Sequence, residues 1–533
     1  MSRLKVVSGV ASADADLRSR MKDECFATSN LLRFAGVAAV LLTADAVFAT
    51  DSPAQSGQIE TIASPAAPWG PVPTDYISLA NEAPGLFVFF NDGPVFGLPG
   101  TVTGDFADRT QLLGDWGGAR TELARYGFFF DMYSTSYYQD VTSGGLETGE
   151  AFVQNTQLSI NIDTGRAGWW SGGLIHATAQ SRIGADPEST FTAGTVVPHY
   201  SGLVVPDPML SDSFLPTELF LAQALSEKAR VVVGKIGTVL LPDQTAYGDS
   251  FKYHFANYNL NKNPISTNFF NPSALGAIGV WSFSPQFSIA GGVLDPNTEA
   301  ENFVSSDSFE NVNLYLTSVM SYDIGGLPGQ VSAVYNWSDK PKINLDSPFG
   351  TLGSAAERKQ AIGSLLGLAS DEGLPTNFKD ESWFTYVTGS QFLFLKDDAA
   401  TVARKRKTGE QIRGVGVFAR AGYAPEESNP ITSDVSVALF AHGMLDGREH
   451  DSFGAGFYYN KISDKLKTSI AKISNGQSAV HDESGVEVFY NFAITPAVRL
   501  ISSYQHIWHP LAAEGIKHRD STDLFQIRLT AAW

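Results

Sequence analysis

Apolar and polar residues alternate along the last stretch of the chain, from Asp523 to Trp533. One face of an extended strand would carry five apolar residues, because strand side chains alternate: Phe525, Ile527, Leu529, Ala531 and Trp533. The other face would carry Gln526, Arg528 and Thr530. A strand of a membrane β-barrel has this pattern, and Trp533 would then join the aromatic girdle at the membrane interface. An edge strand of a soluble sandwich has it too, so the rest of the chain must decide.

The same two-residue period recurs upstream. Leu158, Ile160 and Ile162 alternate with polar residues, and Val486 and Val488 flank Glu487. Together with turn residues, the period predicts about sixteen strands of the length that a tilted membrane strand needs. The predicted strands are 127–140, 152–164, 171–183, 216–227, 229–237, 274–284, 286–294, 312–323, 329–339, 382–395, 412–424, 431–444, 451–461, 484–494, 497–508 and 523–533.

The lengths of the connections separate the two classes of fold. Even-numbered strands lead mostly into short turns and odd-numbered strands into longer loops, and a soluble sandwich has no reason for this segregation. Two connections depart from the rule: 396–411 is long where a short turn is expected, and 425–430 is short where a loop is expected. The pattern predicts an all-β protein, a sixteen-stranded antiparallel transmembrane β-barrel over 127–533, with long extracellular loops and short periplasmic turns.

The segment before the barrel predicts export. Residues 34–42 form a short apolar run, and small residues at 47 and 49 suit a cleavage site, so 1–49 is interpreted as a signal peptide. Either Met1 or Met21 could be the true start. Residues 50–111 form a Pro/Gly-rich N-terminal extension, and 112–126 form a short periplasmic helix segment. Its helix is expected over Ala119–Tyr126, with Gly127 as the terminator.

Composition excludes several functions. The chain has 533 residues, of which 43% are hydrophobic and 17% charged, so it is too apolar for disorder. Its net charge of −19 argues against a nucleic-acid partner. The only cysteine, Cys25, lies in the predicted signal peptide, so the mature chain has no disulfide or Cys-based zinc site. We find no His-Glu-x-x-His, Gly-x-Ser-x-Gly or phosphate-binding glycine motif, and therefore expect neither an enzyme nor a cofactor.

Several motifs between residues 112 and 533 resemble the carbohydrate-selective porin (OprB) family. They are Leu113-Gly114-Asp115-Trp116-Gly117-Gly118-Ala119-Arg120, Val233-Gly234-Lys235, Gly416-Val417-Phe418-Ala419-Arg420, Gly454-Ala455-Gly456-Phe457-Tyr458-Tyr459, Glu487-Val488-Phe489-Tyr490 and Tyr504-Gln505-His506-Ile507-Trp508-His509-Pro510. Trp533 stands where most outer-membrane barrels end in Phe. The resemblance implies a sixteen-stranded sugar channel of the Gram-negative outer membrane, narrowed by inward loops and charged residues.

A sugar channel needs hydrogen-bonding side chains for hydroxyls and aromatic rings for C–H faces. The candidates for this lining are Asp131, His176, Gln180, Arg182, Glu218, Lys235, Lys252, Tyr253, Arg420, Glu487, Arg499 and Arg528. Lys235 is included through the resemblance, although Val231 and Val233 share its face. Each residue could instead be a solvated wall group or half of an ion pair. The connections 184–215 and 238–273 are the candidates for an inward constriction, and the basic run Arg404–Lys407 is interpreted as a solvated turn.

The expected function is passive, carbohydrate-selective diffusion of small sugars across the outer membrane into the periplasm. Expected partners are small carbohydrates, outer-membrane lipid and lipopolysaccharide, and the barrel-assembly machinery, which would bind the C-terminal strand ending in Trp533. One alternative is a general or anion-preferring porin of the same fold. A second is a secreted soluble β-protein that binds glycans, and an outer-membrane hydrolase is a more distant third.

Overall fold

The structure is a computed structural model that describes residues 104–184, 192–199, 213–238, 252–300, 302–408 and 411–533. The predicted signal peptide, the extension up to residue 103 and parts of the two candidate inward connections lie outside these ranges. The backbone of Asp131 is described, but its side chain is not. Among the described residues, no helix is both long and apolar enough to cross a membrane.

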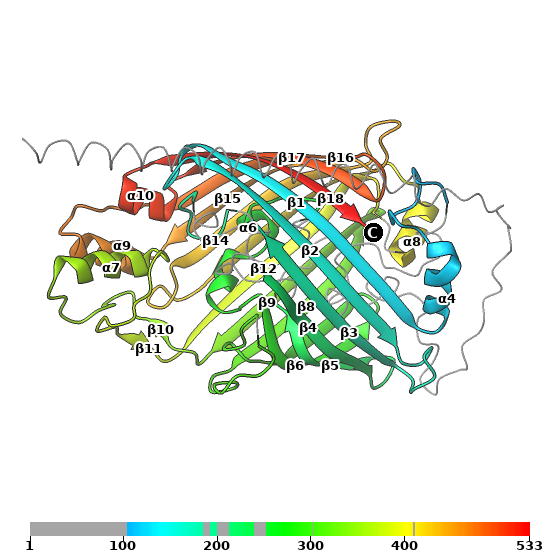
Figure 1. The fold of residues 1–533 in the computed structure, drawn as a ribbon, viewed down its shortest axis with the longest axis horizontal. Coiled ribbons are helices and arrows are strands. Elements are labelled where there is room, and N and C mark those ends of the chain that lie inside the picture. Colours follow the sequence, from blue (N-terminus) through cyan, green and yellow to red (C-terminus); the bar gives the residue numbers. More distant parts are fainter. Residues whose placement is uncertain (1–103, 185–191, 200–212, 239–251, 301, 409–410) are drawn as a thin grey trace, which may run out of the picture. The chain divides into compact units, whose positions relative to one another are not determined.

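Sixteen antiparallel strands close into one barrel, in the order β1-β18-β17-β16-β15-β14-β13-β12-β9-β8-β7-β6-β5-β4-β3-β2 (Figure 1). The strands are β1 (Phe128–Gly144), β2 (Gly149–Asp163), β3 (Gly173–Ile183), β4 (Ser213–Ala224), β5 (Ala229–Gly237), β6 (Ser273–Ser284), β7 (Phe287–Leu294), β8 (Asn313–Ile324), β9 (Leu327–Ser338), β12 (Ser382–Leu395), β13 (Gly414–Tyr423), β14 (Ile431–His442), β15 (Ser452–Ile462), β16 (Glu483–Ala493), β17 (Val498–Trp508) and β18 (Ser521–Ala532). Each predicted strand is present, two of them (229–237 and 382–395) with the predicted bounds and the others with shifted ends, so the predicted fold is confirmed.

The first and last strands form the seam of the barrel. β1 pairs with β18 in a register that sets Tyr137 opposite Arg528. The N–H of Trp533 continues the ladder by donating to the Met132 carbonyl at 2.9 Å. Closure leaves neither strand with an unpaired edge, which in lipid would expose unsatisfied backbone groups.

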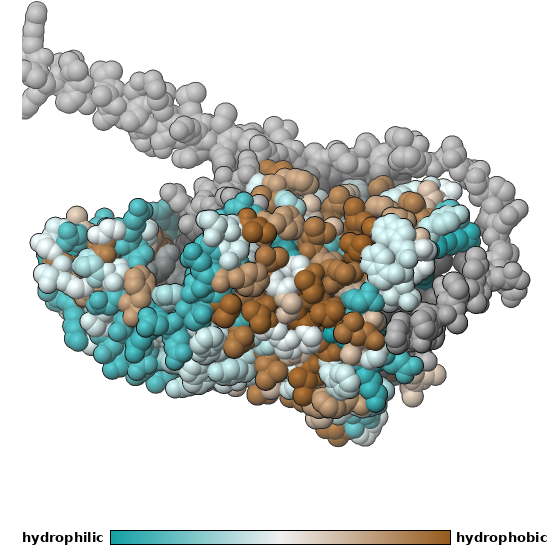
Figure 2. Space-filling model, turned by 90° about the horizontal axis from the view of Figure 1, so that it is seen from below, coloured by the Kyte–Doolittle hydropathy of each residue, from teal (hydrophilic) through white to brown (hydrophobic). Residues whose placement is uncertain are grey.

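Side chains along each strand alternate between the outside and the lumen. On β14, Val435, Val437 and Leu439 are between 42% and 54% exposed on the outer face, whereas Asp434 and Ser436 are buried on the inner face. Figure 2 shows the outward residues as an apolar band across the barrel, with hydrophilic residues gathered at the end that carries the long connections. This distribution matches hydrocarbon outside and water inside.

The long connections gather at one end of the barrel, here called the long-loop rim (Figure 1). They contain α7 (Ala355–Leu365), α9 (Asp464–Ile473) and α10 (Leu511–Lys517), as well as a two-stranded sheet of β10 (Lys342–Ile343) and β11 (Phe378–Lys379). Leu366, Leu466, Ile470 and Leu511 belong to one buried apolar cluster. The helices of this rim therefore fold as one unit rather than as separate loops.

The opposite end of the barrel is here called the short-turn rim. Its connections are short except at 396–411, which the sequence had already marked as too long for a turn. The long connection between β12 and β13 contains α8 (Ala399–Thr408). The prediction of a solvated turn is wrong for Lys405, which is 9% exposed and lies 2.8 Å from a carboxylate oxygen of the buried Asp397. The Arg413 guanidinium contacts the other oxygen of Asp397 at 2.6 Å. Two cations on one buried carboxylate fix the connection to the rim.

A short helix precedes the barrel, as the sequence predicted. η2 (Trp116–Gly118) leads into α4 (Ala119–Arg125), and Gly127 follows with a φ of +83°. A Cβ at Gly127 would approach the Asp163 carbonyl oxygen to 2.5 Å, so this position requires glycine. Arg120 in α4 donates to the carbonyls of Phe130 and Trp533 at 3.2 and 2.9 Å, which links the helix to both sides of the seam.

Candidate functional site

Residues 252–272 of the connection between β5 and β6, here called the inward segment, lie against the lumen faces of the barrel. The segment contains α6 (Tyr258–Asn261) and η4 (Pro264–Asn268), and α6 lies among the barrel strands in Figure 1. Phe255, Ala256 and Leu260 are completely buried. Burial of a connection is unusual, because its backbone groups then need partners from the wall.

Glu487 on β16 supplies partners at the start of α6. Its two carboxylate oxygens accept the backbone N–H groups of Ala256 and Asn257, each at 2.8 Å, and its side chain is fully buried. Asn257 then caps the helix by accepting the N–H of Asn259 at 3.0 Å. A buried carboxylate with two charge-assisted hydrogen bonds is a strong attachment point.

Arg420 on β13 supplies the complementary contacts at the other end of α6. Its guanidinium donates to the carbonyls of Asn259 and Lys262, both at 3.0 Å, and to the Ser436 hydroxyl at 3.1 Å. An anion at the donor end of the helix and a cation at the acceptor end thus fix its direction across the lumen.

Two further predicted residues position the entry to the inward segment. The Arg528 guanidinium donates to the His254 carbonyl. The Lys252 ammonium donates to the Gln157 side chain at 2.8 Å and lies 4.3 Å from the ring centre of Tyr133. These charges are buried and hold the chain in place.

A second polar group lies on the lumen faces of β2, β3 and β4. The His176 ring contacts Asn161 through Nδ1 at 2.7 Å, and its Nε2 lies 3.3 Å from a Glu218 carboxylate oxygen. The ring stacks on Phe220 with centroids 4.7 Å apart. Gln180 lies four residues after His176 on the same face of β3, and its amide donates to the Thr217 hydroxyl at 3.3 Å. The Glu218 side chain retains 12% exposure. Polar side chains and an aromatic face therefore lie side by side here.

Tyr253 and Arg499 form a partly exposed pair. The Arg499 guanidinium carbon lies 5.4 Å from the Tyr253 ring centre, and Arg499 also donates to the His450 carbonyl at 2.7 Å. Arg182 shares the lumen face of β3 but is fully buried. The structure therefore brings nine of the twelve predicted residues together: an attachment group (Glu487, Arg420, Arg528 and Lys252), a histidine group (His176, Gln180 and Glu218) and a cation–aromatic pair (Tyr253 and Arg499).

Lys235 differs from the expectation. It pairs in register with Leu219 and Leu275 and shares their face, which points out of the barrel, since Leu219 is 46% exposed. Its ammonium donates to the carbonyls of Glu299, Ala300 and Asn302 at 2.7 to 3.0 Å. Lys235 therefore fixes the β7–β8 connection and does not line the lumen, because its register with Leu219 and Leu275 has no shift.

The comparison with known sequences assigns the family. Residues 148–524 match the carbohydrate-selective porin, OprB family. The chain belongs to this family. It is a carbohydrate-selective porin of the outer membrane, a channel rather than an enzyme.

Two relatives show how far this similarity reaches. The porin is 24% identical over 459 residues to the putative porin QuiX of Acinetobacter baylyi, covering 80% of this chain and 94% of the relative. The high-pH structure of Pseudomonas putida OprB superposes with a TM-score of 0.65 at 16% identity, covering 81% of this chain and all of that one. The second likeness concerns the fold.

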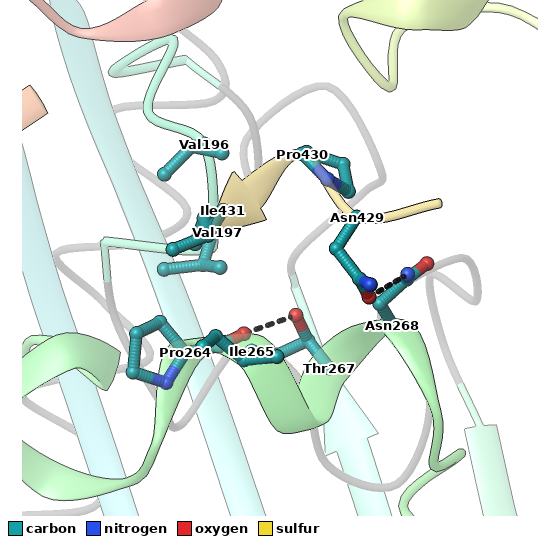
Figure 3. Close-up of a pocket in the computed structure, with 9 residues that line it drawn as sticks. All are labelled: Val196, Val197, Pro264, Ile265, Thr267, Asn268, Asn429, Pro430 and Ile431. Atoms are coloured by element: carbon teal, nitrogen blue, oxygen red, sulfur yellow. Dashed lines mark hydrogen bonds between the residues drawn. The ribbon is translucent and has the colours of Figure 1, made fainter. Parts of the chain in front are cut away.

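The porin also has a pocket above the inward segment, between η4 and neighbouring connections (Figure 3). Its volume is about 190 Å³. Apolar residues make most of the wall, and amides make one end: Val196, Val197, Pro264, Ile265, Thr267, Asn268, Asn429, Pro430 and Ile431. There, the Asn268 amide donates to the Asn429 side chain at 2.9 Å. Among its described lining residues the pocket therefore offers amide and hydroxyl groups for hydrogen bonds, but no aromatic ring for the C–H face of a sugar.

Sequence reasoning missed the asparagines of the inward segment. Asn259 accepts from Asn460 at 2.7 Å, and Asn263 donates to Asp434 at 3.0 Å. The signal was present, since asparagine occupies every second position from Asn257 to Asn263. Such a run in a loop marks backbone turns that need side-chain partners.

Proposed function

We propose that small sugars diffuse passively through the lumen, past a constriction that the inward segment forms, into the periplasm. The observation that supports this most directly is the attachment of α6 by Glu487 and Arg420 from different strands. A segment fixed by buried charges keeps a constant aperture, which a selective channel without energy coupling requires. In this proposal, Glu487, Arg420, Arg528 and Lys252 set the aperture and do not touch the sugar.

Contact with the sugar is assigned to the groups that keep some exposure. Glu218 and Asn161 would exchange hydrogen bonds with hydroxyls, and Arg499 would do the same beside the Tyr253 ring. The ring would accept the C–H face of the sugar. Each contact must remain weak, because a tightly held solute would block the pore.

The test is single-channel conductance in a planar bilayer, with glucose or a malto-oligosaccharide added. We expect the added sugar to reduce ion current in the wild type, and Tyr253→Ala and Glu218→Gln to need several-fold more sugar for the same block. Ser502→Ala is the matched control, since Ser502 is exposed on the outer face of β17. Equal block in all four proteins would contradict the assignment of these residues.

A general or anion-preferring channel would behave differently in liposome swelling. A carbohydrate-selective pore admits neutral sugars faster than anions of equal size, whereas the alternative admits both alike or favours the anion. Ion preference from reversal potentials gives an independent measure of the same difference.

The proposal extends to export and assembly. Residues 1–49 would be cleaved as a signal peptide, 50–111 would remain as a periplasmic extension, and the barrel-assembly machinery would recognise β18 through Trp533. Lipopolysaccharide would surround the outward face at the long-loop rim. Cell fractionation of the wild type and of Trp533→Ala tests this step, and equal outer-membrane levels of the two would remove the role given to Trp533.

A further inference from the structure

Two histidines and a glutamate converge at the long-loop rim, away from the lumen groups. His481 Nδ1 lies 2.5 Å from Glu514 Oε1, and His509 Nδ1 lies 3.0 Å from the same oxygen. One potential ligand atom from each residue lies within 4.8 Å of the others. The three groups therefore face a common point.

The barrel register brings these residues together. Ser484 pairs with Trp508, so His481, just before β16, and His509, just after β17, leave the barrel side by side. Glu514 belongs to α10, in the connection that follows His509. The site therefore joins two connections, and its two histidines are 28 residues apart in the sequence.

Backbone contacts hold all three residues before any ligand binds. The other oxygen of Glu514 accepts the backbone N–H of His481 at 2.8 Å, so His481 is attached to the carboxylate twice. His509 adopts a left-handed backbone with a φ of +53°, and its N–H donates to the Asp520 carbonyl at 2.7 Å. Few residues other than glycine adopt this conformation, and here it directs the imidazole at Glu514.

The start of α10 is fixed by separate contacts. The Leu511 N–H donates to the buried Glu483 carboxylate at 3.2 Å, and the Ala512 N–H donates to the Gly194 carbonyl at 2.7 Å. Leu511 and Ala512 are also part of the buried apolar cluster of the rim. Glu514 thus stands on a rigid support, as metal ligands in stable sites do.

We propose that His481, His509 and Glu514 bind one divalent transition-metal ion at the long-loop rim. Two imidazoles and one carboxylate form a ligand set that suits Zn²⁺, and Cu²⁺ and Ni²⁺ share the preference for imidazole. The ion would bind Nδ1 of each ring, and a proton carried on Nδ1 would move to Nε2 of the same ring through solvent. It would enter from solvent, since the histidine side chains are 63% and 39% exposed while that of Glu514 is 6% exposed. Three protein ligands leave a fourth position for water.

The ion would act as a cross-link between the two connections. Its binding would order residues 474–482 and 509–520 relative to each other, on a rim that already shares one apolar cluster. This inference does not depend on which sugar the channel admits, and its test uses no transport measurement.

The experiment titrates ZnCl₂ into the full-length, detergent-solubilised protein after chelator treatment, with isothermal calorimetry as the readout. The wild type is compared with His481→Ala and with the double variant His481→Ala/His509→Asn. Asparagine keeps access to the left-handed backbone at position 509. His518→Asn is the matched control, because His518 is exposed in the same connection, has a φ of +54° and lies outside the cluster. Heat-modifiability on a gel confirms that each barrel is folded.

We expect saturable binding of one Zn²⁺ per chain in the wild type and in His518→Asn. His481→Ala should weaken binding by about tenfold or more, and the double variant should lose it. Co²⁺ should give the visible absorption of a tetrahedral nitrogen–oxygen site in the wild type and in His518→Asn but not in the double variant. Mg²⁺ should not compete, because it prefers oxygen ligands. Amide exchange at 474–482 should slow with Zn²⁺ only where both histidines are present. Absence of saturable binding in the wild type, or equal binding by the double variant, would overturn the proposal.

Discussion

Glu487 and Arg420, on strands β16 and β13, hold opposite ends of the same four-residue helix. Glu487 accepts N–H groups at the start of α6, at 2.8 Å, and Arg420 donates to carbonyls at its end, at 3.0 Å. Neither side chain is paired with the other in these contacts; the inward segment lies between them. The position of that segment therefore depends on both walls.

Glu487→Gln should loosen the inward segment without removing side-chain volume. An amide is neutral and has one acceptor oxygen, so both backbone N–H groups lose a charged partner and one of them loses its acceptor, at a cost of about 1.5–3 kcal/mol. We expect faster amide exchange at residues 255–262 and a larger, noisier single-channel conductance. Glu449→Gln is the control, because Glu449 is exposed at the short-turn rim. Unchanged exchange would show that α6 is held by other contacts.

Arg420→Met should act on the same helix from the other side, and the two variants should not be additive. The variant leaves two buried carbonyls without a donor, which costs about 1–3 kcal/mol for each group left unsatisfied. Once either end of α6 is free, releasing the second end has less effect. A double-mutant cycle on exchange rates should give a coupling of at least about 0.5 kcal/mol, whereas independent attachment would give a value near zero.

Lys235→Met should disturb the rim and leave the channel intact. The ammonium donates to three carbonyls of the β7–β8 connection, so its loss should expose residues 299–303 to added protease. Conductance and sugar block should match the wild type, because the residue faces away from the lumen. A changed sugar block would restore the original expectation that Lys235 lines the pathway.

Asp397 gives the short-turn rim a defined acid sensitivity. Burial alone would raise the pKa of this carboxyl, but the Lys405 ammonium and the Arg413 N–H and guanidinium outweigh it and lower the pKa to about 2. The folded pKa lies below the ordinary value of 3.8, so the stabilisation is complete above about pH 4 and is lost as the pH falls through about 2. Amide exchange in α8 should rise over that interval. Asp397→Asn should show rapid exchange already at neutral pH, and a pH-independent wild type would contradict the assignment.

The sequence predicted the barrel well because its signal is repeated. Each strand in a membrane carries its own two-residue period, so sixteen weak signals agree, and errors were limited to strand ends. The short helix and its terminator at Gly127 were predictable for a local reason, since glycine readily takes the left-handed backbone that ends a helix.

The partners of the lumen side chains could not be predicted in the same way. The two-residue period places Glu487 and Arg420 on the inner face of their strands. Nothing in those strands indicates that their hydrogen-bond partners come from the inward segment, more than 150 residues away. Lys235 was wrongly assigned to the lumen because it lies in a motif that resembles the porin family. The alternation with Val231 and Val233 had indicated the outer face. Lys405 was assigned to solvent because a run of basic residues is usually exposed. The sequence does not show that one of these residues contacts the buried Asp397 carboxylate.

The apolar cluster shared by Leu366, Leu466 and Leu511 has a consequence for how the cell surface is recognised. Three connections must be folded together before any of them takes its native form. An antibody or phage protein that binds this rim would therefore recognise a conformational epitope, and synthetic peptides copied from single connections would make poor immunogens for the native channel.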